Sequence, residues 1–474
     1  MTPAYVPPPG SIPTLELPDL SAVRRLHLIG IGGAGMRNLA QLLLARGVTI
    51  TGSDLKDSRG LEDLRSAGAA VSIGHAAANV GDPDAVVVST AIGEQNLELR
   101  AARERGILVW ARAQVLAAAA LGTRSVAVTG THGKSTTTSM IAVVAERAGL
   151  DPTFVIGGDL NESGSGARAG AGELFVVEAD ESDGSFLLFR PSIGVVTNVD
   201  VDHLDFYRGG RAEIEAAFAS FLQDAEHVVV CGDDAGAARA LAASGTPGVT
   251  YGTAEGSDVR LTIDSVGPGG ARGRVRADGV ETELALPIDG AHNLLDATAA
   301  VAVAALVGVD AATASDALST FGGVRRRFEL RGTARGASFY DDYGHVPVEL
   351  AVTLDVARRT GPRRLVAVFQ PHRYWRTQAL WRELGESLAA ADVVVVTDVY
   401  GADQEPIPGV TGKLVVDGIN RAAPGKRVVY LPHRADVAPF LAAEVREGDL
   451  VLTMGCGDVW MLGDAALERI AEAG

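Results

Sequence analysis

Cysteine is nearly absent from this chain: Cys231 and Cys456 are the only two among 474 residues. So small a number excludes a disulfide framework and a zinc site built on cysteines, and it is typical of a reducing compartment. The simplest interpretation is that both are small apolar side chains in buried positions. We therefore expect a cytoplasmic protein.

Long apolar runs and basic charge are also scarce. No stretch approaches the ~20 unbroken apolar residues that a membrane span needs. Residues 1–20 lack the basic leader and the apolar segment of a signal peptide, and their prolines favour a disordered tail. Lys and Arg number 42 against 59 Asp and Glu, and the formal charge of -17 opposes binding to nucleic acid. Small nucleotides, held by local groups, fit this charge better than DNA.

Hydrophobic residues make up 47% of the chain, which is enough to bury sizeable cores. The chain is too long for one core, because domains usually hold roughly 100 to 200 residues. Short apolar runs alternate with helical patterns almost to the end, as in βαβ units with parallel sheets. We predict an α/β protein of three domains at 21–122, 123–326 and 327–474.

The three domains are expected to differ in their sheets. The first and third have the strand and helix alternation of a Rossmann-like domain. The second resembles a P-loop ATPase, but residues 260–288 contain Gly and Pro turns between short alternating strands. This composition predicts a small antiparallel sheet added to the middle domain.

A glycine-rich turn, TGTHGKS, follows the β-branched run at 125–129 and opens a helical pattern. In such a turn, backbone N–H groups surround phosphate oxygens, Lys134 reaches the β- and γ-phosphates, and the hydroxyl of Ser135 can bind Mg²⁺. The match to the P-loop pattern is incomplete, because Val128 stands where the first glycine belongs. Its position between a strand and a helix still favours an ATP site.

A second glycine turn, GIGGAG at 30–35, also follows a predicted strand. Asp54 ends the next strand, at the distance where an acidic residue usually meets a ribose. The pattern alone is compatible with NAD, but a tight turn in any doubly wound domain looks the same. The residues leave both interpretations open.

Two acidic segments follow predicted strands of the middle domain. One begins at Glu178 with the sequence EADESD, and the other, TNVDVDHLD, contains His203. Carboxyl ends of parallel strands meet at one edge, where open α/β sheets bind ligands, and Mg²⁺ prefers oxygen ligands. Solvated acidic loops are the alternative, but these two segments and the glycine-rich turn, all in one domain, favour a phosphoryl site with two metal ions.

Basic residues concentrate near the start of the third domain and after its first central strand. Arg325, Arg326 and Arg327 form a triplet, and a second group combines one imidazole with two guanidinium groups that suit phosphate or carboxylate. The second group is His372, Arg373 and Arg376. His345 lies in the loop DDYGH of the same domain.

Taken in order from Gly30 to Asp458, these motifs resemble the Mur ligase family. The matching stretches are GIGGAGM, GSD, STAI, GTHGKSTTT, VEADESDGSF, TNVDVDHLD, GAHN, FGGVRRRFE, DDYGH, FQPHRY, DVYGADQEPIPGVTG and MGCGD. The resemblance implies an ATP-dependent ligase that joins L-alanine to the lactyl carboxylate of UDP-N-acetylmuramate through an acyl phosphate, in peptidoglycan precursor synthesis. It implies ATP and Mg²⁺ as cofactors, neither nucleic acid nor membrane as a partner, and no particular oligomeric state.

The same resemblance assigns roles to individual residues. The first glycine turn would bind the diphosphate of the UDP-sugar instead of NAD, and the loop of Ser89 and Ala91 would meet its uridine end. Substrate contacts would come from Gly32, Gly33, Ala34, Gly35, Asp54, Ser89, Ala91, His372, Arg373 and Arg376. His345, Arg373 and Arg376 match positions that hold the incoming amino acid.

The nucleotide and metal sites are likewise implied by the family pattern. Lys134, Glu178, His203 and His345 would be catalytic, and Ser135, Glu178 and His203 would bind the metal ions. ATP contacts would come from Gly130, Thr131, Gly133, Lys134, Ser135, Thr136, His292, Asn293, Arg327 and Asp342.

Several positions depart from the family pattern. Ser135 replaces a usual Thr, Leu97 a usual Pro, and Cys456 a usual small residue, while Arg37 and Asn38 replace small residues. Val346 stands where a second histidine normally follows the first. The substrate is therefore the expectation most in need of a test.

Three alternatives remain from the sequence. A related ligase attaches a preformed tripeptide to the same sugar nucleotide. A dehydrogenase linked to NAD and fused to a P-loop domain would use the first glycine turn differently. A non-catalytic ATP-binding assembly protein would bind nucleotide without amino-acid-stimulated phosphate release.

Overall fold

The computed structural model describes residues 16–161, 165–204, 206–402 and 404–472. The chain divides into two compact units, with the division between Gly322 and Gly323. Most of the predicted tail at 1–20 lies outside the described residues; Asp19 caps a short 3₁₀ helix, Leu20–Ala22. Among the described helices, none combines the length and the apolar character required to cross a membrane.

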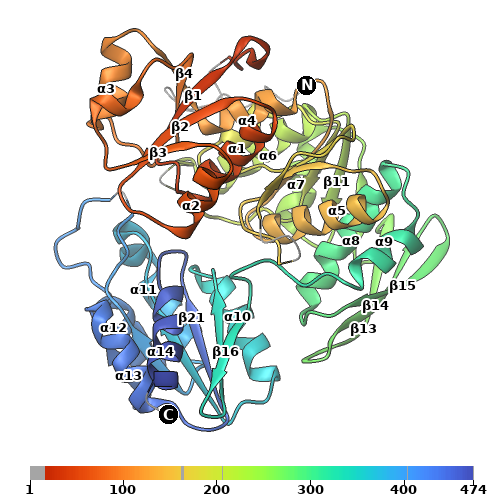
Figure 1. The fold of residues 1–474 in the computed structure, drawn as a ribbon. Helices are drawn as coiled ribbons and strands as arrows, with labels where there is room; N and C mark the ends of the chain where they lie inside the picture. Colours follow the sequence, from red (N-terminus) through yellow and green to blue (C-terminus); the bar gives the residue numbers. More distant parts are fainter. Residues whose placement is uncertain (1–15, 162–164, 205, 403, 473–474) are drawn as a thin grey trace. The chain divides into compact units, whose positions relative to one another are not determined.

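The first sheet is fully parallel and has the strand order β3-β2-β1-β4-β5. β-Branched and leucine residues fill its buried central strands, and Gly33 precedes the first helix. Its strands are β1 Arg25–Ile29, β2 Thr49–Asp54, β3 Ala70–Ile73, β4 Ala85–Val88 and β5 Leu108–Ala111. Its helices are α1 Ala34–Ala45, α2 Arg59–Ser66, α3 Leu97–Glu104 and α4 Arg112–Ala120 (Figure 1).

The second sheet belongs to the same unit and has ten strands in the order β15-β14-β13-β12-β11-β10-β6-β9-β7-β8. Its parallel core consists of β6 Arg124–Thr129, β7 Thr153–Val155, β9 Leu174–Glu178, β10 Ile193–Val196, β11 His227–Cys231 and β12 Val249–Gly252, with β8 Ala167–Arg168 antiparallel at one edge. Its helices are α5 Lys134–Arg147, α6 Arg211–Gln223, α7 Ala235–Ser244, α8 Ala291–Leu306 and α9 Ala311–Leu318.

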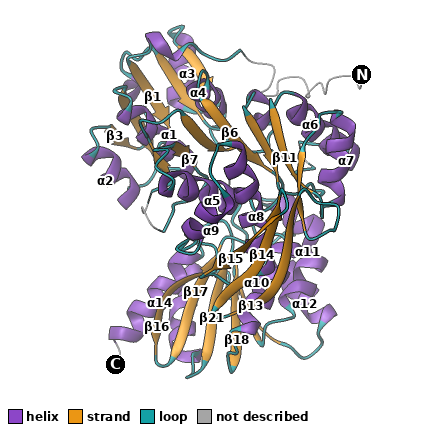
Figure 2. Cartoon of the chain, turned by 90° about the vertical axis from the view of Figure 1, so that its right-hand side faces the viewer, coloured by secondary structure: helices purple, strands orange, loops and turns teal. Residues whose placement is uncertain are grey.

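The predicted antiparallel strands of the middle domain are confirmed, but they do not form a separate sheet. β13 Val259–Gly267, β14 Gly270–Ala277 and β15 Val280–Leu286 lie side by side (Figure 2). β13 pairs in parallel with β12, so the three strands extend the ten-stranded sheet.

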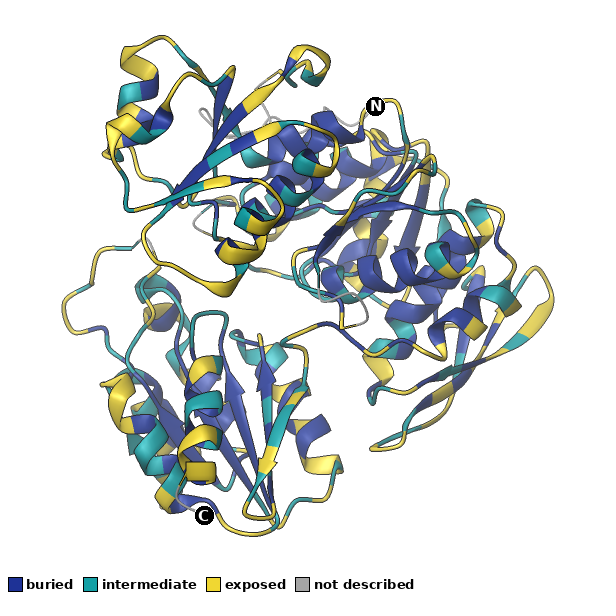
Figure 3. Ribbon diagram, in the orientation of Figure 1, coloured by how far each residue is buried: buried dark blue, intermediate teal, exposed yellow. Residues whose placement is uncertain are grey.

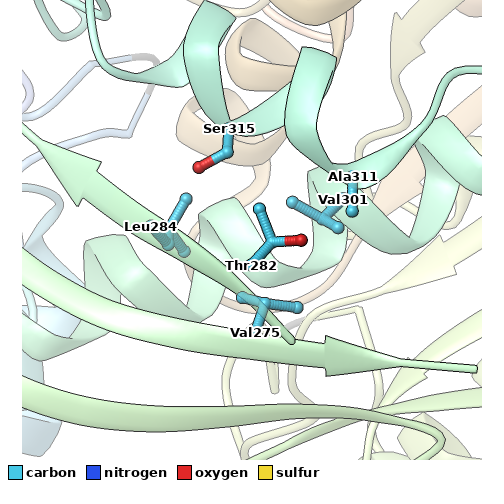
Figure 4. Close-up of a pocket in the computed structure, with 6 residues that line it drawn as sticks. All are labelled: Val275, Thr282, Leu284, Val301, Ala311 and Ser315. Atoms are coloured by element: carbon cyan, nitrogen blue, oxygen red, sulfur yellow. The ribbon is translucent and has the colours of Figure 1, made fainter. Parts of the chain in front are cut away.

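A small space under them is lined by Val275, Thr282, Leu284, Val301, Ala311 and Ser315 (Figure 4). It belongs to the packing of α8 and α9 and contains none of the predicted site residues.

The second unit has one six-stranded sheet with the order β16-β17-β21-β18-β19-β20. Only β16 is antiparallel to its neighbour. The strands are β16 Glu329–Ala334, β17 Ala337–Asp342, β18 Arg364–Phe369, β19 Val393–Val396, β20 Arg427–Tyr430 and β21 Asp449–Met454. The helices are α10 Pro347–Arg359, α11 Tyr374–Leu388, α12 Lys413–Ala422, α13 Val437–Glu444 and α14 Trp460–Glu472.

Figure 3 shows that burial concentrates in the central strands of each sheet. The valine-rich strands β18, β19 and β21 are covered on both faces, because helices pack against each side, and two separate apolar clusters result. This arrangement leaves the loops at the carboxyl ends of the strands as the places where polar side chains gather. The three-domain α/β fold predicted from the sequence is confirmed.

Candidate active site

The turn after β6 is shaped by two glycines and closed by Lys134. Gly130 has φ of +141° and Gly133 has φ of +81°, and residues other than glycine rarely adopt these conformations. α5 begins at Lys134, whose Nζ donates to the carbonyl oxygens of Gly130 at 2.7 Å and Thr131 at 3.1 Å. Residues 130–133 therefore have the conformation of a phosphate-binding turn at a helix N-terminus.

Loops from neighbouring strands hold this turn in place. The His132 N–H donates to Asn198 Oδ1 at 2.8 Å, and the Thr131 N–H donates to the Asn198 carbonyl oxygen at 3.1 Å. Thr137 Oγ1 donates to Asp296 Oδ1, on α8, at 3.1 Å. Asn198 belongs to the segment TNVDVDHLD that the sequence selected. Sequence reasoning did not assign Asp296 to the site; the signal available for Asp296 is its position one helical turn after Asn293.

Glu181 is the acidic residue that connects the cluster. Its Oε2 lies 2.8 Å from Lys134 Nζ, and its Oε1 lies 3.6 Å from His203 Nε2. The sequence pattern selected Glu178 from the same segment, and Glu178 Oε2 accepts from the Gly157 N–H at 2.7 Å. Lys134, Glu181 and His203 therefore come together, because β10, β6 and β9 are neighbours in the sheet. Ser135 is buried in the first turn of α5.

Burial and neighbouring charges shift the pKa values of the residues in this cluster. Burial, with a smaller contribution from Asp180, raises the pKa of Glu181 to about 8 against the opposing effect of Lys134. Burial alone would lower the pKa of Lys134, but Glu181, Asp180 and Glu178 together raise it. Several carboxylates thus share one ammonium group in a buried loop. A divalent cation would relieve their repulsion, and hard oxygen donors are what Mg²⁺ prefers, so these residues fit that ion.

At the start of α8, Asn293 Nδ2 donates to the Asp289 carbonyl oxygen at 2.6 Å. The ring of His292 lies over Gly290, where an added Cβ would approach it to 2.4 Å. Gly290 has φ of +115°, so the backbone turns sharply just before the helix. The two residues selected from the stretch GAHN therefore lie in the first turn of α8, whose later residue Asp296 accepts a hydrogen bond from Thr137 in the helix that follows the turn at 130–133.

The first glycine turn is fixed by Asp54 and by the loop after β4. The Gly32 N–H donates to Asp54 Oδ2 at 2.9 Å. Ile92, in the loop of Ser89 and Ala91, would lie 3.1 Å from a Cβ added to Gly30. β2, β1 and β4 are adjacent, so the structure brings together the two segments that the sequence selected. Gly33 precedes α1 directly, and Ala34 and Gly35 form its first turn.

A buried polar network behind this turn escaped sequence reasoning. Glu98 is fully buried, and its carboxylate accepts from Asn79 Nδ2 at 2.6 Å and from Ser53 Oγ at 2.5 Å. His27 Nε2 lies 3.1 Å from the same group. Burial would raise the pKa of Glu98, but the hydrogen bonds from His27, Ser53 and Asn79 lower it to about 2. The ionised carboxylate therefore orders the segment that leads to Asp54.

Replacing Glu98 with alanine should destabilise the amino-terminal domain by about 3 kcal/mol, because the buried donors lose their acceptor. The midpoint of the first transition in urea unfolding at pH 7 would report the loss. Glu104→Ala, at the exposed end of the same helix, is the matched control and should leave the midpoint unchanged. Equal effects of the two substitutions would contradict the role of the network.

In the second unit, Asp342 is buried at the end of β17 and holds two loops. Its Oδ2 accepts from the Phe328 N–H at 2.8 Å, and its Oδ1 accepts from the Gly344 N–H at 2.7 Å. Burial raises the pKa of this carboxyl group, while Arg327 opposes the shift. The guanidinium of Arg327 also lies 5.3 Å from the ring centre of Tyr343. Arg327 and Asp342 therefore belong to one cluster.

His345, His372 and Arg376 lie together at the carboxyl edge of this sheet. The two imidazole rings are 5.5 Å apart, edge to face. Arg376 is buried, and its Nη1 lies 3.3 Å from His372 Nδ1. Burial, together with the neighbouring His345, Arg376 and Arg373, lowers the pKa of His372 to about 2. Arg373 has φ of +65° and directly precedes α11, with its N–H bonded to the Tyr400 carbonyl oxygen at 2.9 Å.

Comparison with known proteins covers all three domains. Residues 25–124 match the model for the Mur ligase family, catalytic domain, residues 128–304 match the Mur ligase middle domain, and residues 326–457 match the Mur ligase, glutamate ligase domain. A curated relative from Saccharopolyspora erythraea, a UDP-N-acetylmuramate–L-alanine ligase, is 46% identical over 95% of this chain and 94% of its own. This chain belongs to the Mur ligase family.

Solved structures agree with this assignment. The UDP-N-acetylmuramate-alanine ligase MurC from Thermotoga maritima is similar with a TM-score of 0.83, 28% identity, and coverage of 95% of this chain and 100% of that one. A murein peptide ligase from Psychrobacter arcticus gives a TM-score of 0.75 at 25% identity, covering 94% and 98%. Membership of the Mur ligases confirms the resemblance noted from the sequence. A dehydrogenase linked to NAD is not supported.

Proposed function

We propose that this Mur ligase joins L-alanine to the lactyl carboxylate of UDP-N-acetylmuramate at the expense of ATP, in peptidoglycan precursor synthesis. The observation that carries the proposal is the 46% identity, along 95% of the chain, to a curated ligase of that name. Two glycine turns at the carboxyl edges of separate sheets support it, since the reaction needs one diphosphate site for its acid and another for ATP. The tripeptide alternative is not favoured by these relatives.

For the UDP-sugar, we assign the turn of Gly32, Gly33, Ala34 and Gly35 together with Asp54, Ser89 and Ala91. The packing of Ile92 against Gly30 supports this assignment, because it joins the loop after β4 to the turn. The hydrogen bond of Asp54 to the Gly32 N–H gives Asp54 a second role, which is to shape the turn.

For ATP, we assign the turn of Gly130, Thr131, Gly133, Lys134, Ser135 and Thr136 to the phosphates. His292 and Asn293 would contact the adenine, Asp342 the ribose and Arg327 a phosphate. The Lys134 ammonium supports this assignment, because it lies within 3.1 Å of two carbonyl oxygens of the turn. Ser135, Glu178 and His203 would hold Mg²⁺, which would supply positive charge to the phosphates.

For the amino acid, we assign His345, Arg373 and Arg376, with His372 beside them. The buried guanidinium of Arg376 is a suitable partner for the carboxylate of alanine. Domain limits of 21–122, 123–326 and 327–474 complete the proposal. A cytoplasmic location, with neither nucleic acid nor membrane as a partner, is proposed from composition and charge; the oligomeric state stays open.

The chemistry follows from the poor reactivity of a carboxylate towards amines. The lactyl carboxylate attacks the γ-phosphorus of ATP, ADP leaves, and an acyl phosphate forms. Lys134 and Arg327 neutralise the charge that develops on the phosphoryl oxygens, and Mg²⁺ held by Ser135, Glu178 and His203 would add positive charge there. The neutral amine of alanine then attacks the acyl carbon, phosphate departs, and the amine loses a proton as the amide forms.

The decisive assay supplies ATP, Mg²⁺ and UDP-N-acetylmuramate and varies the third substrate among alanine, glycine, serine and the tripeptide. We expect phosphate release to require both the sugar nucleotide and an amino acid, with the product heavier by one alanine residue. Phosphate release at the same rate without the sugar nucleotide would refute the ligase proposal. Faster turnover with the tripeptide would identify the alternative ligase.

The Arg376→Lys variant tests the amino-acid site. Lysine keeps the charge but loses the planar pair of donors, so the KM for alanine should rise at least about tenfold while kcat changes less. Arg382→Lys, exposed on the same helix, is the control and should leave both constants unchanged. A change in kcat alone would argue against a contact with the amino acid.

A further inference from the structure

Three adjacent strands of the second unit each end beside a side chain that can bind a soft metal ion. His345 follows β17, Cys456 follows β21 and His372 follows β18, and these strands are consecutive in the sheet. One ligand atom from each residue lies within 4.8 Å of the other two. Across the described parts of the chain, this is the one group of three or more His, Cys, Asp or Glu side chains that meets this spacing.

Two imidazoles and one thiolate form a ligand set for Zn²⁺. In a tetrahedral zinc site, metal–ligand bonds of about 2.0 to 2.3 Å separate the ligand atoms by about 3.5 Å. Side-chain rotations that move the three ligand atoms about 1 Å closer together would therefore complete the geometry. All three residues are partly exposed, which leaves access for the ion and for water as a fourth ligand. Because the two cysteines are distant in the chain, a zinc site with several cysteine ligands is excluded. A site with one thiolate and two imidazole ligands is still possible.

The surroundings of His345 orient it as a metal ligand. Its Nδ1 lies 3.2 Å from the Tyr343 carbonyl oxygen and 3.4 Å from Glu349 Oε2, and both oxygens are acceptors. Nδ1 therefore carries the proton in the neutral ring, and Nε2 carries the lone pair that a metal needs. A carboxylate behind a histidine is the usual support of a zinc ligand. The His345 N–H also donates to Glu349 Oε2 at 2.9 Å.

Neighbouring charges set a limit on the affinity. Arg376 Nη1 lies 3.3 Å from His372 Nδ1 and opposes a dication, and it has to move away if that nitrogen is the ligand. The thiolate that forms when Cys456 gives its proton to solvent offsets one of the two positive charges of the ion, and Glu349 offsets the other, so the charge of Arg376 is left to oppose binding. The site should therefore be weaker than a structural zinc centre of four protein ligands.

We propose that His345, His372 and Cys456 bind a divalent transition metal ion, with Zn²⁺ the best fit and water as the fourth ligand. The ion would lie among the residues assigned above to the amino acid, so Zn²⁺ would compete with alanine; this consequence alone rests on the proposed function. Metal binding itself does not depend on it.

The test uses Co²⁺ with the full-length protein, because a cobalt–thiolate bond gives a charge-transfer band in the near ultraviolet. We expect the band with the unaltered chain and with Cys231→Ala, and its loss in Cys456→Ala. Cys231 is the matched control, being the only other cysteine. Absence of the band in the unaltered protein would overturn the proposal without reference to any variant. So would a band that persists in Cys456→Ala.

A second measurement locates the two imidazoles. Competition with a chromophoric zinc chelator should show affinity for Zn²⁺ lowered at least about tenfold in His345→Gln, in His372→Gln and in Cys456→Ser. His433→Gln, a histidine outside the cluster, should retain full affinity. If the histidine variants bind Zn²⁺ as the unaltered protein does, the assignment is wrong. Failure of the ligase assay with intact zinc binding would refute the proposed function and leave this site standing.

Discussion

Lys134→Ala should lower amino-acid-dependent phosphate release by at least about a thousandfold, because the Lys134 ammonium group is bonded directly to the turn after β6, where it can neutralise phosphate charge. The Lys134 Nζ lies within 3.1 Å of two carbonyl oxygens of that turn. Without the Lys134 ammonium group, the negative charge on the transferred phosphoryl oxygens would be less neutralised, and it would be repelled more strongly by the carboxylates of the adjacent loop. Single-turnover release of phosphate at saturating ATP would measure the loss.

The fold should survive this substitution. Burial raises the pKa of Glu181 to about 8, even though Lys134 lowers it. When the lysine is removed, the pKa rises further, so Glu181 stays neutral at pH 7 and leaves no unpaired buried charge. Thermal unfolding should therefore change little. Lys413→Ala, at an exposed lysine, should leave both turnover and unfolding unchanged, and residual turnover within tenfold of normal in Lys134→Ala would refute the role of Lys134.

Local patterns predicted the secondary structure around the sites well. The run before the turn at 130–133 became β6, the hydroxyl-rich segment after it became α5, and the glycine turn at 30–35 joins β1 to α1. Each of these features depends on residues close together in the chain. Strand-forming side chains, glycines with positive φ and apolar helix faces act within a few residues, so a single sequence contains the information.

Contacts between distant segments were harder to predict. Lys134 and Glu181 are 47 residues apart, and Thr137 and Asp296 are 159 residues apart. The segment EADESD offered several carboxylates, and only the packing of β9 beside β6 brings Glu181 to the lysine. Glu98 was missed for the same reason, since its partners come from β1, β2 and the loop after β3. The roles of the predicted site residues themselves stay predictions until ligands are bound.

In the second unit, the order of strands in the sheet brings together residues that are far apart in the sequence. β21 is the last strand in sequence but lies between β17 and β18 in the sheet. Cys456 is therefore brought to His345 and His372, although 84 residues separate it from the nearer of the two (456 minus 372). Cys456 was noted as a departure from the family pattern, but nothing in the sequence indicated which side chains would surround it. Sheet order decides such clusters, and one sequence does not specify it.

Gly130→Ala should abolish turnover by a second route, through the shape of the turn. Gly130 has φ of +141°, and an added Cβ would lie 2.0 Å from Thr197 Oγ1 and 3.1 Å from both backbone atoms N and O of Asn198. Neither the backbone conformation nor the space accommodates a methyl group. The turn has to open, which breaks the bonds of Asn198 to residues 131 and 132 and displaces the backbone N–H groups that would surround phosphate.

Gly149→Ala is the matched control for this substitution. Gly149 also has positive φ, +76°, but nothing lies within 4 Å of an added Cβ. Both variants therefore suffer backbone strain, of about 1 kcal/mol at Gly149 and more at Gly130, and only Gly130→Ala adds the clash. We expect turnover to fall at least about a hundredfold and nucleotide binding, measured by calorimetry with ADP, to be lost in Gly130→Ala, whereas Gly149→Ala should bind and turn over normally. If the two variants lose turnover equally, strain alone is responsible, and the close approach of the turn to Thr197 and Asn198 has no part in ATP binding.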